Sequence, residues 1–320
     1  MSTDANLLGF DPSGQSNPNN SFPLSPEELS FFKSLTKIDN EEQLRAHIVS
    51  VQKAAYKVFS YSCIRKFAFV QLTLTHQRAY RQAINLRIFQ RDPILLDIGC
   101  CFGTDVRKVV LDGWPAQFVI ASDIRQEFWD YGHKLFLSTA ESLPVRFIAG
   151  DILDPSILQP REPIIDEKEI TAILGQPTPS VSEVQNLTPL LGKISAIHAS
   201  SLFHLFSEVE QLALARCLAS LLRPEKGSVI FGQHVGRKVM GHRAPYIGDV
   251  ASLAPMFCHS PQSWSDLWVT QVFGGNDGRG NERIKVDVEF VDVNWVVGKE
   301  IFQEVEPNDK FYMQWCITRL

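Results

Sequence analysis

The stretch that decides the fold runs from Ile94 to Asp105 and has the sequence ILLDIGCCFGTD. Its first three residues form a short apolar run, which is typical of a strand buried on both faces of a parallel sheet. The run ends at Asp97, and the glycines at positions 99 and 103 predict a tight turn, because glycine lets the backbone approach a ligand closely. We expect this turn to open a helix at about Thr104.

The charge of this stretch narrows the choice of ligand. Dinucleotide sites use the spacing G-x-G-x-x-G and place an anionic pyrophosphate at the helix N-terminus. Here the second glycine of that pattern is Cys101 and the third is Thr104. The Asp97 carboxylate would also repel a pyrophosphate in the same crevice. It suits a ligand with cationic groups and no phosphate, and S-adenosylmethionine (SAM), with its ammonium and sulfonium groups, is such a ligand.

The composition indicates one globular domain with extensions that acts on small molecules. The chain has 320 residues, of which 44% are hydrophobic and 21% charged, with a formal net charge of -5. No block of lysine and arginine stands out, whereas binding to a phosphate backbone calls for a basic face. We therefore expect a small-molecule substrate and no nucleic acid.

Cysteine usage and hydropathy indicate a cytoplasmic protein without a metal. The six cysteines show neither a C-x-x-C motif nor paired spacing, so the sequence predicts neither a zinc site nor a disulfide framework. The N-terminus lacks a basic region followed by an apolar run, and no apolar stretch approaches the ~18 residues of a membrane span.

We divide the chain into three parts. Residues 1–24 are rich in Ser, Asn, Pro and Gly and are expected to form a disordered tail. Residues 25–90 are mostly helical in pattern and should form an N-terminal cap, with a helix start at Ser25-Pro26 and Asp39 as a further N-cap. The aromatic stretch 59–69 within them either packs on the sheet or covers the bound ligands. Residues 91–320 form the ligand-binding domain.

Two further strands end in acidic residues. The strand predicted for 118–123 ends in Asp123, 20 residues beyond Gly103, where a doubly wound fold places the acid that binds ribose hydroxyls. The next strand, starting at Val145, leads into Gly150, Asp151 and Ile152. Three strand ends that each carry one acid form the strongest signal in the chain.

The second half of the chain supplies the other strands. Residues 155–192 are proline-rich and poorly periodic, and they form either part of the substrate wall or a surface excursion. The fourth strand ends near His198, and the fifth covers 228–232, with His234 just beyond its end. Two closing strands follow at 284–290 and 311–318.

Together these motifs resemble the class I SAM-dependent methyltransferases. The resemblance implies an α/β fold with a doubly wound, mostly parallel, Rossmann-like sheet of seven strands whose last strand inserts antiparallel, preceded by the helical cap. More narrowly, the chain is similar to fungal methyltransferases of meroterpenoid biosynthesis, which methylate a carboxyl group of a farnesylated aromatic polyketide. The motifs that carry this similarity are Tyr61–Arg65, Asp97–Asp105, Ile197–Ser200 and Phe203–Phe206.

The resemblance also assigns roles to residues and implies a homodimer. In this family the acid after the third strand meets the adenine amino group, and the next apolar residue packs on the ring. The residues predicted to contact SAM are Asp97, Gly99, Gly103, Asp123, Ile124, Gly150, Asp151, Ile152 and His198. The candidates for substrate contact are His198, His204 and His234, because the end of the fourth strand faces the transferred methyl group in this fold.

We expect direct transfer of the methyl group to a carboxylate, without a side-chain base. A carboxylic acid is already ionised at neutral pH, and the sequence places no carboxylate beside any of the three histidines to orient it. Two alternatives remain open. One is a nicotinamide-dependent oxidoreductase with the same kind of sheet, and the other is a non-catalytic SAM-binding regulator of secondary metabolism.

Overall fold

A computed structural model describes residues 24–243, 256–291 and 311–320. The tail expected to be disordered, 1–24, lies outside this part of the chain except for Leu24. None of the helices in the described ranges is long and apolar enough to cross a bilayer.

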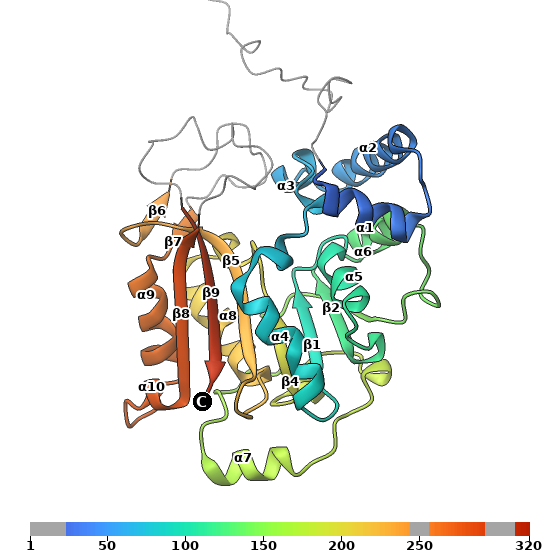
Figure 1. The fold of residues 1–320 in the computed structure, drawn as a ribbon. Helices are drawn as coiled ribbons and strands as arrows, with labels where there is room; N and C mark the ends of the chain where they lie inside the picture. Colours follow the sequence, from blue (N-terminus) through green and yellow to red (C-terminus); the bar gives the residue numbers. More distant parts are fainter. Residues whose placement is uncertain (1–23, 244–255, 292–310) are drawn as a thin grey trace, which may run out of the picture.

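The centre of the molecule is a seven-stranded sheet with the order β3-β2-β1-β4-β5-β9-β8 (Figure 1). The strands are β1 (Ile94–Ile98), β2 (Val119–Asp123), β3 (Arg146–Ala149), β4 (Ile194–His198), β5 (Val229–Gly236), β8 (Ile284–Val291) and β9 (Phe311–Arg319). Strands β1 to β5 are parallel, and β9 lies antiparallel between β5 and β8. The predicted doubly wound sheet with its inserted last strand is confirmed.

Successive side chains of the inner strands point to opposite faces of the sheet, and both faces are apolar. Helices therefore cover both faces. Leu95 packs with α4 and α5 on one face, whereas Ile94 and Leu96 pack with α8 on the other. The helices are α1 (Pro26–Thr36), α2 (Glu41–Val58), α3 (Ser62–Arg65), α4 (Arg78–Phe89), α5 (Thr104–Leu111), α6 (Gln126–Phe136), α7 (Glu167–Leu174), α8 (Glu208–Leu221), α9 (Pro261–Asp266) and α10 (Gly280–Arg283). Figure 1 shows α4 in front of the sheet and α8 behind it.

Shorter elements connect these layers. The 3₁₀ turns are η1 (Ala68–Val70), η2 (Thr73–His76), η3 (Ala116–Phe118), η4 (Val181–Glu183), η5 (Thr188–Leu190) and η6 (Phe203–Leu205), and a π-helix, η7 (Leu267–Val272), continues α9. A separate two-stranded sheet pairs β6 (Gly241–Arg243) with β7 (Met256–Cys258), and the sequence did not predict it.

The N-terminal helices pack on α6. Phe32 stacks on Phe136 with ring centroids 4.9 Å apart. Helix α1 begins at the predicted Ser25-Pro26 start, with a capping box in which the Ser25 side chain accepts a hydrogen bond from Glu28 N. The N-cap predicted at Asp39 is wrong, since Asn40 caps α2 by accepting from Gln43 N. The division into a cap and a ligand-binding domain at residue 90 stays a prediction.

Two expectations about the second half of the chain are corrected. Strand β5 continues to Gly236, because it pairs with β9 along its whole length, so His234 lies inside the strand and not beyond its end. The crossover 155–192 does not form a substrate wall around α7. There, Lys193 Nζ donates to Ile173 O and Arg319 Nη2 donates to Ile164 O, which places this part where the parallel strands begin (bottom of Figure 1).

Candidate functional site

The turn after β1 adopts the conformation that its glycines predicted. Gly99 and Gly103 have φ of 74° and 67°, in the left-handed region that glycine adopts without strain. Gly99 N and Cys100 N both donate to Ser122 O, at 2.8 and 3.1 Å, which ties the turn to β2. Cys101 also has a positive φ, 50°, which is uncommon for a residue with a side chain.

Asp123 joins this turn to the end of β2. Its Oδ2 accepts a hydrogen bond from Cys101 N at 2.8 Å, and its Oδ1 accepts one from Arg125 N at 3.0 Å. Burial raises the pKa of the Asp123 carboxyl, although both backbone donors act in the opposite direction. The next residue, Ile124, is 61% exposed, so an apolar side chain next to the carboxylate in sequence is open to solvent.

The end of β3 lies next to Asp123. Gly150 N donates to Asp123 O at 3.0 Å, and a Cβ at Gly150 would lie 2.4 Å from the Ile157 side chain. Asp151 is exposed, and its Oδ1 accepts from Leu153 N. Ile152 is only 4% exposed and packs in the core, so its predicted ring contact would be made from a buried position.

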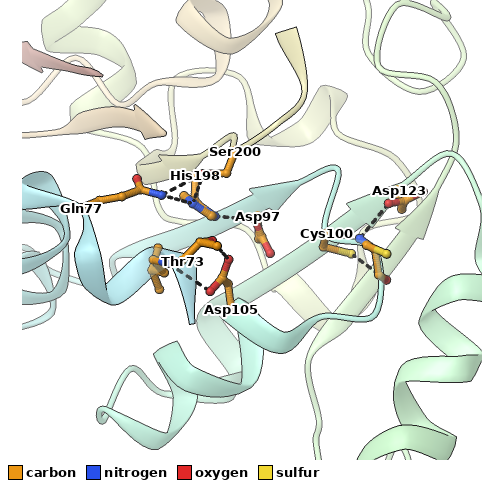
Figure 2. A network of polar contacts seen from close by, with 10 residues as sticks. Thr73, Gln77, Asp97, Cys100, Asp105, Asp123, His198 and Ser200 are labelled. Atoms are coloured by element: carbon orange, nitrogen blue, oxygen red, sulfur yellow. Dashed lines mark hydrogen bonds and ion pairs between the residues drawn. The ribbon is translucent and has the colours of Figure 1, made fainter. Parts of the chain in front are cut away.

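A chain of buried polar contacts links β1 to the loop after β4 (Figure 2). His198 Nδ1 lies 2.8 Å from Asp97 Oδ1, and Ser200 Oγ lies 2.7 Å from His198 Nε2. Gln77 Nε2 donates to Ser200 Oγ at 2.8 Å and lies 3.3 Å from His198 Nε2. Asp97 and His198 are 4% and 2% exposed, whereas Ser200 is partly exposed.

This contact overturns the expectation that no carboxylate orients a histidine. Asp97 and His198 are register partners on neighbouring strands, so the parallel pairing brings the carboxylate to the imidazole. Burial lowers the pKa of His198, but the charge and hydrogen bond of Asp97, together with the charge of Asp105, outweigh it and raise the pKa above its ordinary value. The imidazole is therefore held in one orientation and favours its protonated form.

Sequence reasoning gave no role to Asp105, Gln77 or Ser200. Asp105 Oδ2 accepts from Thr73 Oγ1 at 3.0 Å and Oδ1 from Leu74 N at 3.3 Å. The only local signal was the position of Asp105 in the first turn of the helix that the glycines open. Gln77 and Ser200 gave none, because their contact spans 123 positions of the chain.

The segment before α4 covers this edge of the sheet. Thr104 Oγ1 donates to Phe69 O at 2.6 Å, and the donors from η2 hold Asp105 at the start of α5. Gln77 follows directly and reaches Ser200. These contacts join the end of the aromatic stretch 59–69 to the start of α5, and its position over the ligands stays a prediction.

The other two candidate histidines lie away from Asp97. His234 is 1% exposed and its Nδ1 accepts from Trp315 Nε1 at 2.9 Å. Burial, with the charges of neighbouring histidines, lowers its pKa well below the ordinary value. Burial and the charge of Arg243 lower the pKa of His204 to about 4. Both rings are therefore neutral near pH 7, and their contact with substrate stays a prediction.

Comparisons with known proteins agree with this fold. Residues 18–70 match the family described as meroterpenoid methyltransferase N-terminal domain. Methyltransferase ausD of Penicillium brasilianum is 27% identical over 227 residues, covering 71% of this chain and 70% of its own length. O-methyltransferase phiE of a fungal species is 29% identical over 248 residues, with 77% and 72% coverage. Together with the order of the seven strands, these similarities support a SAM-dependent methyltransferase with the class I fold.

Among solved structures, this methyltransferase is similar to the 1,6-didemethyltoxoflavin-N1-methyltransferase of Burkholderia thailandensis. The identity is 12% and the TM-score 0.44, over 94% of this chain and 92% of that one. The relatives are named methyltransferases, so the comparisons give no support to the nicotinamide-dependent oxidoreductase, one of the two alternatives from the sequence.

The carboxyl edge of the sheet suits SAM as the cofactor. Asp97 and Asp105 carry negative charge where a cationic ligand would be stabilised, and Asp123 lies at the position expected for a ribose partner. Ile124 offers exposed apolar surface for a ring. Within the described residues, no group of three potential ligands could hold a metal ion.

The conformation of Cys101 generates a first prediction. Replacing Cys101 by glycine should change the free energy of unfolding by no more than about 1 kcal/mol, because relief of the positive φ offsets the lost side-chain contacts. The matched variant Cys100→Gly, at a buried position without a positive φ, should lose roughly 1–3 kcal/mol. Urea denaturation measures both, and equal losses would contradict the assignment of strain to position 101.

Cys101→Gly should also retain turnover. Burial raises the pKa of the Cys101 thiol well above its ordinary value, so little thiolate is present at neutral pH. Lost turnover with intact SAM binding would point to covalent chemistry at this thiol.

The partly buried Asp105 carboxyl generates a second prediction. Burial raises its pKa to about 6, although the charge of His198 and the hydrogen bonds of Thr73 and Leu74 oppose the shift. An acid whose pKa is raised on folding binds more protons in the folded state, so its contribution to stability is lost as pH rises from about 4 through 6. We therefore compare the free energy of unfolding of Asp105→Asn with that of the wild type. This difference should favour the variant more at pH 7 than at pH 4, by on the order of 2 kcal/mol.

Urea denaturation at pH 4, 5, 6 and 7 measures this difference. The control is Asp154→Asn, at an exposed carboxyl whose pKa is lowered by hydrogen bonds from Ser156, which should show no such gain. Parallel pH curves for Asp105→Asn and the wild type would contradict the raised pKa.

Proposed function

We propose that this protein methylates a carboxylate oxygen of a prenylated polyketide intermediate in a fungal meroterpenoid pathway. Two similarities support the pathway: the family description that matches residues 18–70, and the relatives, which are named methyltransferases. O-methyltransferase phiE, at 29% identity, supports oxygen as the accepting atom.

We assign a carboxylate as the methyl acceptor because both ring nitrogens of His198 are already hydrogen-bonded. A general base must lie within hydrogen-bond reach of the proton that it removes. His198 is the histidine that a carboxylate orients, yet Asp97 and Ser200 already occupy its two nitrogens and its ring is 2% exposed. A carboxylic acid with a pKa of about 4 needs no base at neutral pH, whereas a phenol with a pKa of about 10 does. This arrangement favours an acceptor that arrives ionised.

The reaction is a direct displacement. Bound SAM supplies a methyl group on a cationic sulfur. A carboxylate oxygen forms the new bond to the methyl carbon while the carbon–sulfur bond breaks. The electron pair of the broken bond stays on sulfur, which becomes a neutral thioether. The protein's part is to hold the acceptor in line and to exclude water. Buried side chains around His198 and the segment 69–77 serve these two purposes.

The test is product analysis with matched acceptors. The purified protein and SAM would be incubated with a farnesylated dihydroxybenzoic acid, with its carboxamide, and with the farnesylated resorcinol that lacks the carboxyl group. We expect a methyl ester from the acid and no product from the other two, with the methyl located by mass spectrometry and NMR. A methyl on a phenol oxygen would overturn the carboxylate assignment. Binding of SAM without turnover of the acid would favour the non-catalytic regulator.

The position of Asp123 generates a prediction about the cofactor. Asp123→Ala should weaken SAM binding by roughly 1–3 kcal/mol, because it removes the proposed ribose hydrogen bonds and the acceptor that holds Cys101 N. Calorimetry with SAM measures the loss, and the exposed Asp130→Ala on α6 is the control. Unchanged affinity in a folded Asp123→Ala protein would remove this residue from the cofactor site.

A further inference from the structure

Ser200 occupies a special place in the polar chain at the end of β4. It is the member that reaches the surface, since Gln77, Asp97 and His198 are all at most 4% exposed and Ser200 is partly exposed. Its Oγ receives a hydrogen bond from Gln77 Nε2 at 2.8 Å and lies 2.7 Å from His198 Nε2. Of these four residues, Ser200 is therefore the one open to contact with a group from outside.

Counting hydrogens fixes the direction of that hydroxyl. When His198 carries both ring protons, Nδ1–H donates to Asp97 and Nε2–H donates to Ser200 Oγ. Gln77 donates to the same oxygen, so both lone pairs of Ser200 are used. With Gln77 Nε2 and not its unpaired Oε1 facing Ser200, the single Ser200 hydrogen has no bonded acceptor within this chain of contacts and points away from it. Ser200 becomes a hydrogen-bond donor that requires an acceptor outside the cluster.

The charges around His198 favour this protonated state. The titratable groups that act on the ring are Asp97 of β1 and Asp105 of α5, and both are acids. From β5, the ring that packs on it is the uncharged Phe231, with centroids 5.1 Å apart, and the neutral amide of Gln77 approaches from the N-terminal side. The imidazolium is thus compensated by Asp97, and the positive charge is not left unpaired in the interior.

We propose that the Ser200 hydroxyl binds the carboxylate of the methyl acceptor, and that His198, Asp97 and Gln77 are positioning residues that keep its hydrogen directed at that carboxylate. This inference rests on the proposed function, since it assigns the contact that recognises the acceptor's anionic group. An ionised acceptor oxygen is a stronger hydrogen-bond partner than a neutral one, so the contact favours an acid over its amide. The site so defined is built partly by the N-terminal segment, through Gln77.

The arrangement also links acceptor binding to pH. When His198 loses its second proton, Nε2 becomes an acceptor, and the Ser200 hydroxyl turns inward to donate to it. The acceptor then loses its donor. Binding of the acid should therefore weaken as pH rises through the pKa of His198, in the range where the acid itself stays fully ionised.

The test measures acceptor binding apart from catalysis. Calorimetry would follow the farnesylated dihydroxybenzoic acid and its carboxamide binding to protein saturated with S-adenosylhomocysteine. Ser200→Ala should weaken binding of the acid roughly ten- to a hundredfold and that of the carboxamide less, with SAM affinity unchanged within about twofold. The control is Ser201→Ala, which removes the neighbouring exposed hydroxyl and should leave both affinities unchanged.

A second variant tests the positioning role. His198→Gln should weaken binding of the acid at pH 6.5 and abolish the loss of affinity that the wild type shows towards pH 9. A residue that only supported the fold would weaken binding equally at each pH. Circular dichroism and urea denaturation establish that each variant is folded.

The outcomes separate the inference from the proposed function. A wild-type protein that makes the methyl ester, with unchanged acid binding in folded Ser200→Ala, would overturn the inference and leave the function intact. A loss of SAM affinity in Ser200→Ala, with acid binding unaffected, would assign the hydroxyl to the cofactor and also overturn it. A wild-type protein that neither binds nor methylates the acid would overturn both.

Discussion

The hydrogen bond between Asp97 and His198 is the interaction on which the site depends. It joins two neighbouring parallel strands at their carboxyl ends, where both side chains are almost completely buried. A buried carboxylate is costly unless it is paired, and removing one partner of a buried ion pair commonly costs roughly 3–5 kcal/mol. The pair therefore constrains the register of β1 and β4 as well as the orientation of the imidazole, so stability and the geometry of the site have a common origin.

The turn after β1 and the segment before α4 position the groups around this pair. The backbone of the turn is held by Ser122 O and by the Asp123 carboxylate, so hydrogen bonds join the ends of β1 and β2. The segment before α4 holds Asp105 through Thr73 and Leu74 and reaches Ser200 through Gln77. A part of the chain outside the sheet thereby reaches the polar chain at the end of β4.

The second group of buried rings, around His234, contrasts with this polar chain. His234 packs against Trp264 and Trp315 with ring centroids 4.6 and 5.8 Å apart, and its pKa is lowered by burial. His198 ends β4 and His234 lies inside β5. Despite burial, the charges of Asp97 and Asp105 raise the pKa of the first ring, whereas burial, with the charges of neighbouring histidines, lowers the pKa of the second. The chemical role of a histidine here follows from its neighbour across the sheet and not from its place at a strand end.

Local sequence determined the elements and their order. The apolar run at β1, the glycines at 99 and 103, the acid 20 residues later and the Ser25-Pro26 helix start are local patterns, and they predicted β1, its turn, the end of β2 and the start of α1. Only the tertiary structure decided which side chains meet. Asp97 and His198 are 101 positions apart, and their contact depends on strand order and register, which no local pattern encodes. The same holds for the length of β5, set by pairing with β9, and for the position of α7, because its proline-rich surroundings carry no periodicity that would orient it.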